Sequence, residues 1–215
     1  MCNELQRLVA GASWRLSKIL RAKHYFSTSD LFLLYKAKVL SYIECRTPAI
    51  FHAADTHLES LDAVQRRFLR DINISEEVAI MDYNLAPLNV RRNIAMLGVI
   101  HRAALGIGPT QLHAFFKKGS CAPRATRMRS GQHSQNLEDM RGSHFLEIAR
   151  RSALGLVAVY NLLSEELIVS SHVQLFQAKL QNLTKRQLHI GNSEWRQLFS
   201  PRVPMYCHPL RCVQF

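Results

Sequence analysis

Long apolar runs are missing from this sequence. No stretch approaches the roughly 20 apolar residues that are needed to span a bilayer. The charged residues Glu4 and Arg7 come too early for a signal peptide. Five cysteines, an odd number at scattered positions, do not form a disulfide framework and suit a reducing compartment. We therefore expect an intracellular protein, nuclear or cytoplasmic, with no membrane partner.

Catalytic motifs are also absent. The chain has no P-loop, no Gly-x-Ser-x-Gly elbow and no His-Glu-x-x-His helix. The string Gly106-Ile107-Gly108-Pro109 lacks the third glycine and the preceding strand of a dinucleotide-binding loop. Pairs of adjacent carboxylates occur in polar, loop-like segments at Glu76/Glu77, Glu138/Asp139 and Glu165/Glu166. We interpret these pairs as helix caps or solvated charge, and we expect neither a cofactor nor a small-molecule substrate.

The residues that could bind a metal do not have a recognised spacing. Cys207, His208 and Cys212 could supply three zinc ligands, with Cys121 as a distant fourth. Their spacing is not that of a zinc finger. The sequence therefore favours the absence of a metal site.

Strict alternation of apolar and polar residues, the pattern of a half-buried strand, is missing as well. Apolar residues instead recur every three or four positions, which places them on one face of a helix. We predict an all-α fold, a helical bundle of about six to eight amphipathic helices with a basic irregular linker in the middle.

The first half of the chain predicts four main helices. Residues 3–24 form the first, with Leu5, Leu8, Val9, Ala12, Leu16, Ile19 and Leu20 on its apolar side. The second begins in the run Ser27–Asp30, carries Leu34, Val39 and Ile43, and ends before Pro48. The third is capped by Asp55 or Thr56 and buries Leu58, Leu61, Val64, Phe68 and Ile72, while Gln65, Arg66, Arg67 and Arg70 project elsewhere. The fourth runs from Pro87 to Gly106 and buries Val90, Ile94, Leu97 and Ala104.

A change in composition suggests how the chain is divided. Residues 117–135 hold almost nothing apolar and are rich in Gly, Ser, Pro and Arg. We predict a helical domain over 1–116, a basic flexible linker over 117–140, a C-terminal helical segment over 141–200 and an irregular tail over 201–215. The C-terminal segment is expected to contain helices near 145–163, 171–188 and 194–199.

The net charge of +12 is the strongest compositional feature. Residues 1–116 carry 14 Lys/Arg against 10 Asp/Glu, and residues 117–215 carry 14 against 6, so the excess is weighted to the second half. A basic balance of this size favours polyanions, of which nucleic acid is the commonest in a cell. The simpler reading is a solvated basic surface.

The order of residues in the second and third predicted helices resembles a known pattern. The matching residues are Tyr35, Lys36, Val39, Tyr42, Glu44, Pro48, Leu61, Val64, Gln65, Arg66 and Arg67. They resemble the "LYK..V...LEY..P......L..L..VQRR" segment that follows the palm of LINE-type (non-LTR) retrotransposon reverse transcriptases. Residues 85–97 resemble the family's "L..L.L.SLE.RR...L". Residues 153–180 resemble its "WN.LP......SV..FK..L", although Tyr160, Leu163 and Gln177 replace the usual Trp, Pro and Lys.

The resemblance implies a thumb-like region that grips template and primer. It would place phosphate contacts at Arg66, Arg67 and Arg70, and at Arg91 and Arg92 in the family's "RR" position. These arginines could instead solvate the bundle or pair with Glu59, Asp62 and Asp71. The linker cations Lys117, Lys118, Arg124, Arg127 and Arg129 would act as a diffuse tether. Replacing Arg66 and Arg67 with alanine should then lower nucleic-acid affinity and its salt dependence.

The family's catalytic "Tyr-x-Asp-Asp" motif is absent, so the chain lacks the paired aspartates that hold two Mg²⁺ ions in a polymerase palm. We therefore expect a non-catalytic fragment that binds RNA or DNA without sequence preference. Two alternatives stay open. The chain could be a stand-alone helical module that docks another protein, or a retroelement relic without function.

Overall fold

The fold is all-α, as the sequence predicts. The computed structural model describes residues 2–119, 133–138 and 150–213. These residues contain eleven α-helices and several shorter helical turns, more than the six to eight expected, because some predicted helices break into pieces. No strand occurs within the described ranges, where Lys118 and Leu137 form an isolated antiparallel bridge.

The chain divides into two compact units, Met1–Arg92 and Asn93–Phe215. The division falls inside α7 (Leu88–Ala104) and not at the predicted boundary after residue 116. The start of α7 is bound to unit 1 through its arginines, whereas His101 near its end bonds to residues of unit 2. These contacts join residues far apart in sequence, so the composition of the chain did not reveal them.

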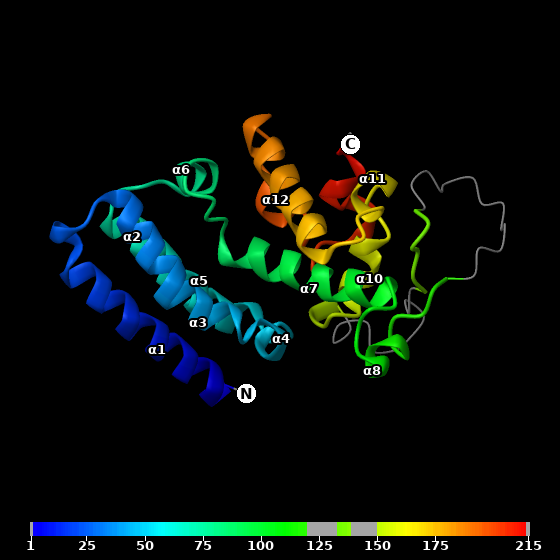
Figure 1. The fold of residues 1–215 in the computed structure, drawn as a ribbon, viewed down its shortest axis with the longest axis horizontal. Helices are drawn as coiled ribbons and strands as arrows, with labels where there is room; N and C mark the ends of the chain where they lie inside the picture. Colours follow the sequence, from blue (N-terminus) through cyan, green and yellow to red (C-terminus); the bar gives the residue numbers. More distant parts are fainter. Residues whose placement is uncertain (1, 120–132, 139–149, 214–215) are drawn as a thin grey trace. The chain divides into compact units, whose positions relative to one another are not determined.

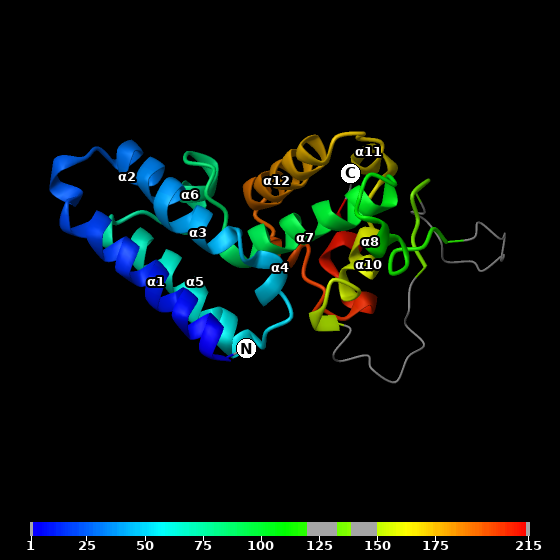
Figure 2. The ribbon, with the colours of Figure 1, turned by 60° about the horizontal axis from the view of Figure 1, so that its bottom comes forward.

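Unit 1 is built from helices that lie side by side. In chain order these are α1 (Cys2–Arg21), a 3₁₀ turn (Lys23–Tyr25), α2 (Thr28–Tyr35), a π-helical turn (Lys36–Leu40), α3 (Ser41–Glu44), α4 (Thr47–Ile50), α5 (Asp55–Asp71) and α6 (Glu76–Met81). Helix α1 packs against both α5 and the α2–α3 segment (Figures 1 and 2). The second predicted helix is thus three helical pieces that follow one another without a gap.

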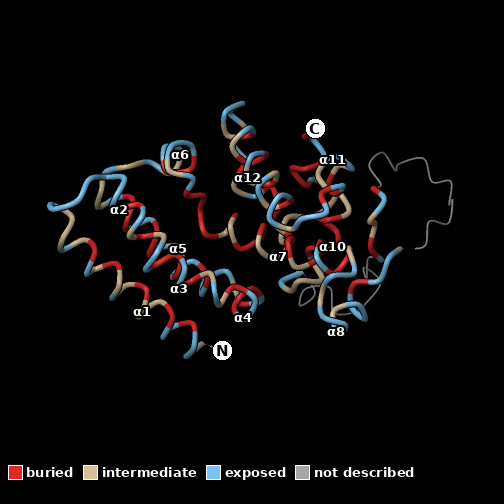
Figure 3. Tube along the Cα trace, viewed as in Figure 1, coloured by how far each residue is buried: buried red, intermediate tan, exposed pale blue. Residues whose placement is uncertain are grey.

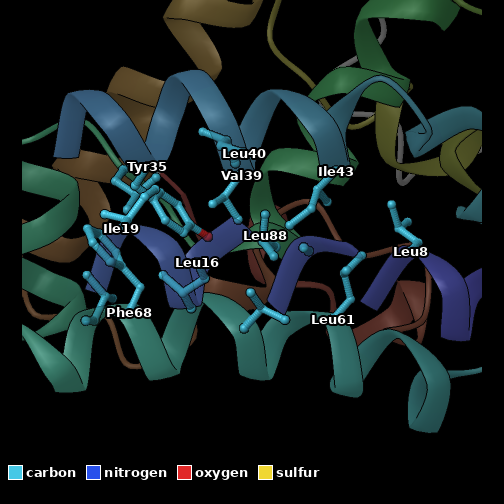
Figure 4. Packing of buried hydrophobic residues seen from close by; sticks show 14 of the residues in the cluster. Leu8, Leu16, Ile19, Tyr35, Val39, Leu40, Ile43, Leu61, Phe68 and Leu88 are labelled. Atoms are coloured by element: carbon cyan, nitrogen blue, oxygen red, sulfur yellow. The ribbon is translucent and has the colours of Figure 1, made fainter. Parts of the chain in front are cut away.

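The predicted apolar stripes form the core of unit 1. Leu8, Leu16 and Ile19 of α1 meet Leu61 and Phe68 of α5 in one cluster of buried residues (Figure 4). Val39, Leu40 and Ile43 close this cluster from the α2–α3 segment (Figure 4). Burying side chains of this size contributes roughly 1.5–3 kcal/mol each. Ile72, predicted to be buried, is only partly so.

Four aromatic side chains order one end of this core. The ring of Tyr35 stacks on that of Phe68 with centroids 4.2 Å apart. Phe32 meets Phe68 edge to face at 5.4 Å and stacks on Tyr83 at 3.8 Å. Such pairs add about 0.5–1.5 kcal/mol beyond the area that they bury. The conformations of α2, α5 and the segment after α6 are therefore coupled.

Helix boundaries follow the predicted signals in most places. Ser27 and Asp30 form a capping box at the start of α2, as the polar run predicts. Helix α3 ends before Pro48, which lies in the first turn of α4. The predicted cap of α5 is wrong, because Ala54 occupies the cap position and makes no side-chain bond. Gly106 adopts a φ of 74° after the end of α7, as expected for a helix-terminating glycine.

Unit 2 contains the rest of α7 with α8 (Thr110–His113), α10 (Gly155–Tyr160), α11 (Glu165–Ile168) and α12 (Val173–His189). Helix α12 confirms the prediction for 171–188. The helix expected over 145–163 is shorter than predicted, since 152–154 form turns; residues 145–149 lie outside the described residues. The tail over 201–215 is less irregular than predicted, because Met205–Cys207 and Pro209–Arg211 form 3₁₀ turns and His208 and Leu210 are buried.

The described parts of the predicted linker are packed against unit 2. Leu137 is buried, and its N–H and C=O bond to the side chain of Asn161 at 3.0 and 2.8 Å. The N–H of Gly119 donates to the carbonyl of Asn136 at 2.9 Å. Residues 117–119 and 133–138 therefore form part of the folded unit, a correction to their assignment as a flexible connection. Ser134 adds two hydrogen bonds, from its N–H and its hydroxyl to the carboxylate of Glu165.

Candidate nucleic-acid interface

The predicted arginines of α5 are largely neutralised by neighbouring carboxylates. Arg66 pairs with Glu59 at 2.6 Å and Arg67 with Asp71 at 3.6 Å, all with partly or largely exposed side chains. Arg70 is exposed near the end of the helix. Helix α5 (Asp55–Asp71) contains four carboxylates and three arginines, so its net charge is −1. The field of α5 is therefore weak, and its arginines are poorly placed to attract phosphate.

Arg91 and Arg92 stabilise unit 1 from within. Arg92 is 5% exposed, and its guanidinium binds both carboxylate oxygens of Asp62. Arg91 pairs with Glu44 at 2.5 Å, with 18% of its side chain exposed. A guanidinium bound in this way has few donors left for a ligand. We therefore leave both arginines out of the proposed interface.

The predicted linker cations that the structure describes belong to unit 2. Lys117 and Lys118 are exposed beside the bridge to Leu137. Arg124, Arg127 and Arg129 lie outside the described residues. Of the seven predicted contacts that are described, five therefore belong to unit 1 and two to unit 2.

Among the described residues, α1 carries a cationic surface that the predicted set omits. Residues 5–29 contain five Lys/Arg and no Asp or Glu. Arg7, Trp14, Lys18 and Arg21 are all exposed and lie on one side of the helix, since their spacings of seven, four and three residues match its turns. We call these four residues the α1 basic face. Figure 3 shows the exposed and buried positions alternating along α1.

The cations of the α1 basic face carry little compensating charge. Arg7 approaches Glu4 at 3.6 Å with both side chains exposed, which contributes at most about 1 kcal/mol. Lys18 places its Nζ 4.2 Å from the ring centroid of Trp14, whose side chain stays 59% exposed. No ion pair involves Lys18 or Arg21 in the described part of the chain. Their charges are therefore available to an anionic ligand.

A neighbouring aromatic contact fixes α1 to α3. The guanidinium carbons of Arg15 and Arg46 lie 3.7 and 4.4 Å from the ring centroid of Tyr42. Arg15 also donates to the carbonyl of Gly11 at 3.1 Å. A Cβ at Gly11 would lie 2.5 Å from the Tyr42 hydroxyl, so only glycine lets this ring approach α1 so closely. Arg15 and Tyr42 thus serve mainly to join two helices.

The charge balance of each helix is a partial signal for the α1 basic face. Counting arginines alone favours α5, where two adjacent arginines match a family pattern. Counting carboxylates as well separates the neutralised α5 from α1, which lies in a stretch of 25 residues, from 5 to 29, without Asp or Glu. Residues 83–137 also lack Asp and Glu and carry eight Lys/Arg, so the count alone does not select α1. The exposure of Arg7, Lys18 and Arg21 on one side of the helix is known only from the fold.

A buried histidine pair in unit 2 is a second cluster of polar groups. His101 Nε2 lies 2.8 Å from the carbonyl of Ser170 and Nδ1 lies 2.9 Å from the Tyr160 hydroxyl. A carbonyl only accepts, so Nε2 carries the proton and the Tyr160 hydroxyl donates to Nδ1. His133 Nε2 likewise donates to the Tyr160 carbonyl at 3.0 Å. Burial lowers the pKa of both histidines.

The proposed zinc ligands are not arranged as a metal site. His208 is buried, with Nε2 on the Ser200 carbonyl at 3.1 Å and Nδ1 accepting from the Leu210 N–H at 3.3 Å, so neither nitrogen is free. Burial lowers the pKa of His208. Cys207 and Cys212 are exposed thiols, and Cys121 lies outside the described residues. Within the described residues no three His, Cys, Asp or Glu side chains lie together as metal ligands.

None of the described helices is both long enough and apolar enough to cross a membrane.

No protein-family model, curated protein or solved structure matches this chain. Of the two clusters, the histidine pair is buried and internally bonded, whereas the α1 basic face is exposed and largely unpaired. An exposed cluster is the one that a partner can reach.

Proposed function

We propose that this chain is a non-catalytic protein that binds the backbone of RNA or DNA, without sequence preference, through the α1 basic face. One observation carries the proposal: five cations and no carboxylate over residues 5–29, with Arg7, Lys18 and Arg21 exposed on one side of α1. Cations in such an array neutralise successive phosphates and release the counterions condensed on them. They contact no base edges and therefore read no sequence.

The sequence patterns support the same class of function. The region over residues 35–67 resembles a reverse transcriptase segment that holds template and primer, and the chain lacks that family's catalytic aspartates. The proposed site nevertheless differs from the one that the family pattern suggests. The arginines of that pattern, on α5 and α7, already pair with carboxylates, namely Glu59, Asp71, Glu44 and Asp62. We therefore assign nucleic-acid binding to α1.

Two variants of equal charge test this assignment. Lys18→Gln with Arg21→Gln removes two cations from the α1 basic face, and Arg66→Gln with Arg67→Gln removes two from α5. Both lower the net charge of the chain from +12 by the same amount, so any difference between them reports position and not total charge. Circular dichroism checks that both variants are folded.

The readout is binding of a labelled oligonucleotide by fluorescence anisotropy over a range of salt concentrations. We expect the α1 variant to weaken binding and to flatten the plot of log K against log salt by roughly 0.7 for each lost phosphate contact. We expect a smaller effect from the α5 variant, because its arginines are already paired. Equal effects, or a larger effect on α5, would refute the assignment to α1.

A further inference from the structure

We propose that Trp14 is a stacking platform for an unpaired base, and that the α1 basic face therefore selects single-stranded over double-stranded nucleic acid. This inference rests on the proposed function and deepens it, since it names the form of nucleic acid that the same site takes.

The position of Trp14 is the first argument. Its side chain is 59% exposed although the chain has apolar cores in which to bury it, and Trp195, the other tryptophan, is 3% exposed. An exposed apolar side chain alone means little. Trp14, however, lies between Arg7 and Lys18 on the same side of α1, in a stretch without carboxylates. The Trp14 ring therefore lies on the same side of α1 as cations that can bind the phosphates of a nucleic acid.

The cations around the ring are the second argument. Lys18 Nζ lies 4.2 Å and the Arg15 guanidinium carbon 6.0 Å from the Trp14 ring centroid. These contacts restrict the ring while leaving more than half of the side chain open. An aromatic ring beside cations is the combination that single-strand-binding surfaces use, with the ring taking a base and the cations taking the phosphates.

The selectivity follows from the geometry of the bases. In a duplex both faces of each internal base are already stacked on neighbours, so a protein ring must first disrupt that stacking. A single strand offers its bases at little cost, and every base has a face that can stack. Phosphate contacts are available in both forms. Trp14 therefore adds affinity for single strands alone.

Tyr42 provides a matched control. It is also aromatic and close to Arg15, but Arg15 and Arg46 both lie over its ring, at 3.7 and 4.4 Å from the centroid. Only one cation, Lys18, lies this close to the Trp14 ring, and Trp14 is 59% exposed, whereas Tyr42 is only partly exposed and has two guanidinium groups over its ring. Less of the Tyr42 ring is therefore open to a base. Tyr42→Leu should therefore leave the preference for single strands intact, whereas Trp14→Ala should remove it.

The test compares a single-stranded oligonucleotide of about 20 nucleotides with the duplex of the same length, using the full chain. We expect wild type to bind the single strand more tightly. Trp14→Ala should weaken binding to the single strand about tenfold and leave duplex binding nearly unchanged, and Trp14→Phe should retain most of the preference. The single strand should also quench the fluorescence of Trp14, with Trp195→Phe used to remove the second signal.

Two results would overturn the inference, and they are distinguishable. If Trp14→Ala binds single strands as tightly as wild type while Lys18→Gln with Arg21→Gln still weakens binding, the stacking role fails and the proposed function stands. If wild type binds neither form, the proposed function fails and the inference fails with it.

Discussion

The guanidinium of Arg92 donates two hydrogen bonds to the carboxylate of Asp62, from Nη1 to Oδ1 at 2.5 Å and from Nη2 to Oδ2 at 2.9 Å. This pair joins the first turns of α7 to the middle of α5, with side chains 6% and 18% exposed. An arginine that a sequence pattern assigns to nucleic acid thus holds the fold together. The contribution of this pair to stability can be measured.

Asp62→Asn should destabilise the protein by roughly 3 kcal/mol, because it leaves the buried Arg92 charge without its partner. The control is Glu59→Gln, which breaks the exposed pair with Arg66 and should cost at most about 1 kcal/mol. Urea unfolding followed by circular dichroism gives both values. Equal losses from the two substitutions would show that the Arg92–Asp62 pair is no more important than a surface pair.

Removing the hydroxyl group should affect the stability of the protein differently at two buried tyrosines. The buried Tyr35 hydroxyl has no hydrogen-bond partner among the residues that the structure describes, so Tyr35→Phe should be neutral or stabilise the chain by up to about 1 kcal/mol. The Tyr160 hydroxyl donates to His101, so Tyr160→Phe leaves a buried nitrogen unpaired and should cost about 1–3 kcal/mol. Thermal unfolding measures both. A loss of stability in Tyr35→Phe would contradict the first assignment.

Acid should destabilise unit 2. Burial lowers the pKa of His101, His133 and His208 in the folded chain, so the unfolded chain takes up protons first as pH falls. Their stability contribution is complete above the unfolded value of about 6.5 and is lost as pH falls from there through the folded pKa values. Each histidine contributes up to about 1.4 kcal/mol per pH unit in that window.

Trp195 fluorescence reports this unfolding in a Trp14→Phe background, because Trp195 lies in unit 2. We expect stability to fall steadily between about pH 6.5 and pH 5, and the slope to decrease when His133 is replaced by glutamine. A stability that does not vary over this range would refute the burial of the neutral histidines.

Gly11→Ala should reveal the contact between α1 and Tyr42. In an open helix interior this change stabilises by about 1 kcal/mol. At Gly11 the added Cβ would lie 2.5 Å from the Tyr42 hydroxyl and displace the ring from Arg15 and Arg46. The full gain in stability from Gly11→Ala should therefore appear only when Tyr42→Ala is also present. A double-mutant cycle that shows no coupling would place Tyr42 elsewhere.

The secondary structure was predictable where the apolar period is long and regular. Leu5, Leu8, Ala12, Leu16 and Ile19 are buried along α1 as predicted, and Phe176 and Leu180 are buried on α12. The prediction from the sequence is wrong where a single long-range contact determines whether a side chain is buried. Gln65 was expected to face solvent, yet it is buried because its side-chain amide donates to the Ala86 carbonyl at 3.1 Å.

The candidate site was less predictable than the fold. For the arginines at 66–67 and 91–92 the sequence left two interpretations open, phosphate contacts or pairing with Glu59, Asp62 and Asp71, and the structure contains these three pairs. Glu44, the partner of Arg91, was not among the predicted partners and is brought to it only by folding. Trp14 could be read equally well as a core residue from its sequence alone. Its exposure is a consequence of which face of α1 packs against α5 and the α2–α3 segment.

Photochemical cross-linking shows whether nucleic acid lies along α1. A single-stranded oligonucleotide is cross-linked to the wild-type chain, and the modified peptides are identified by mass spectrometry. We expect cross-links within residues 5–29, with Trp14 the main site. Cross-links confined to other peptides, above all those of Asp55–Asp71, would contradict it.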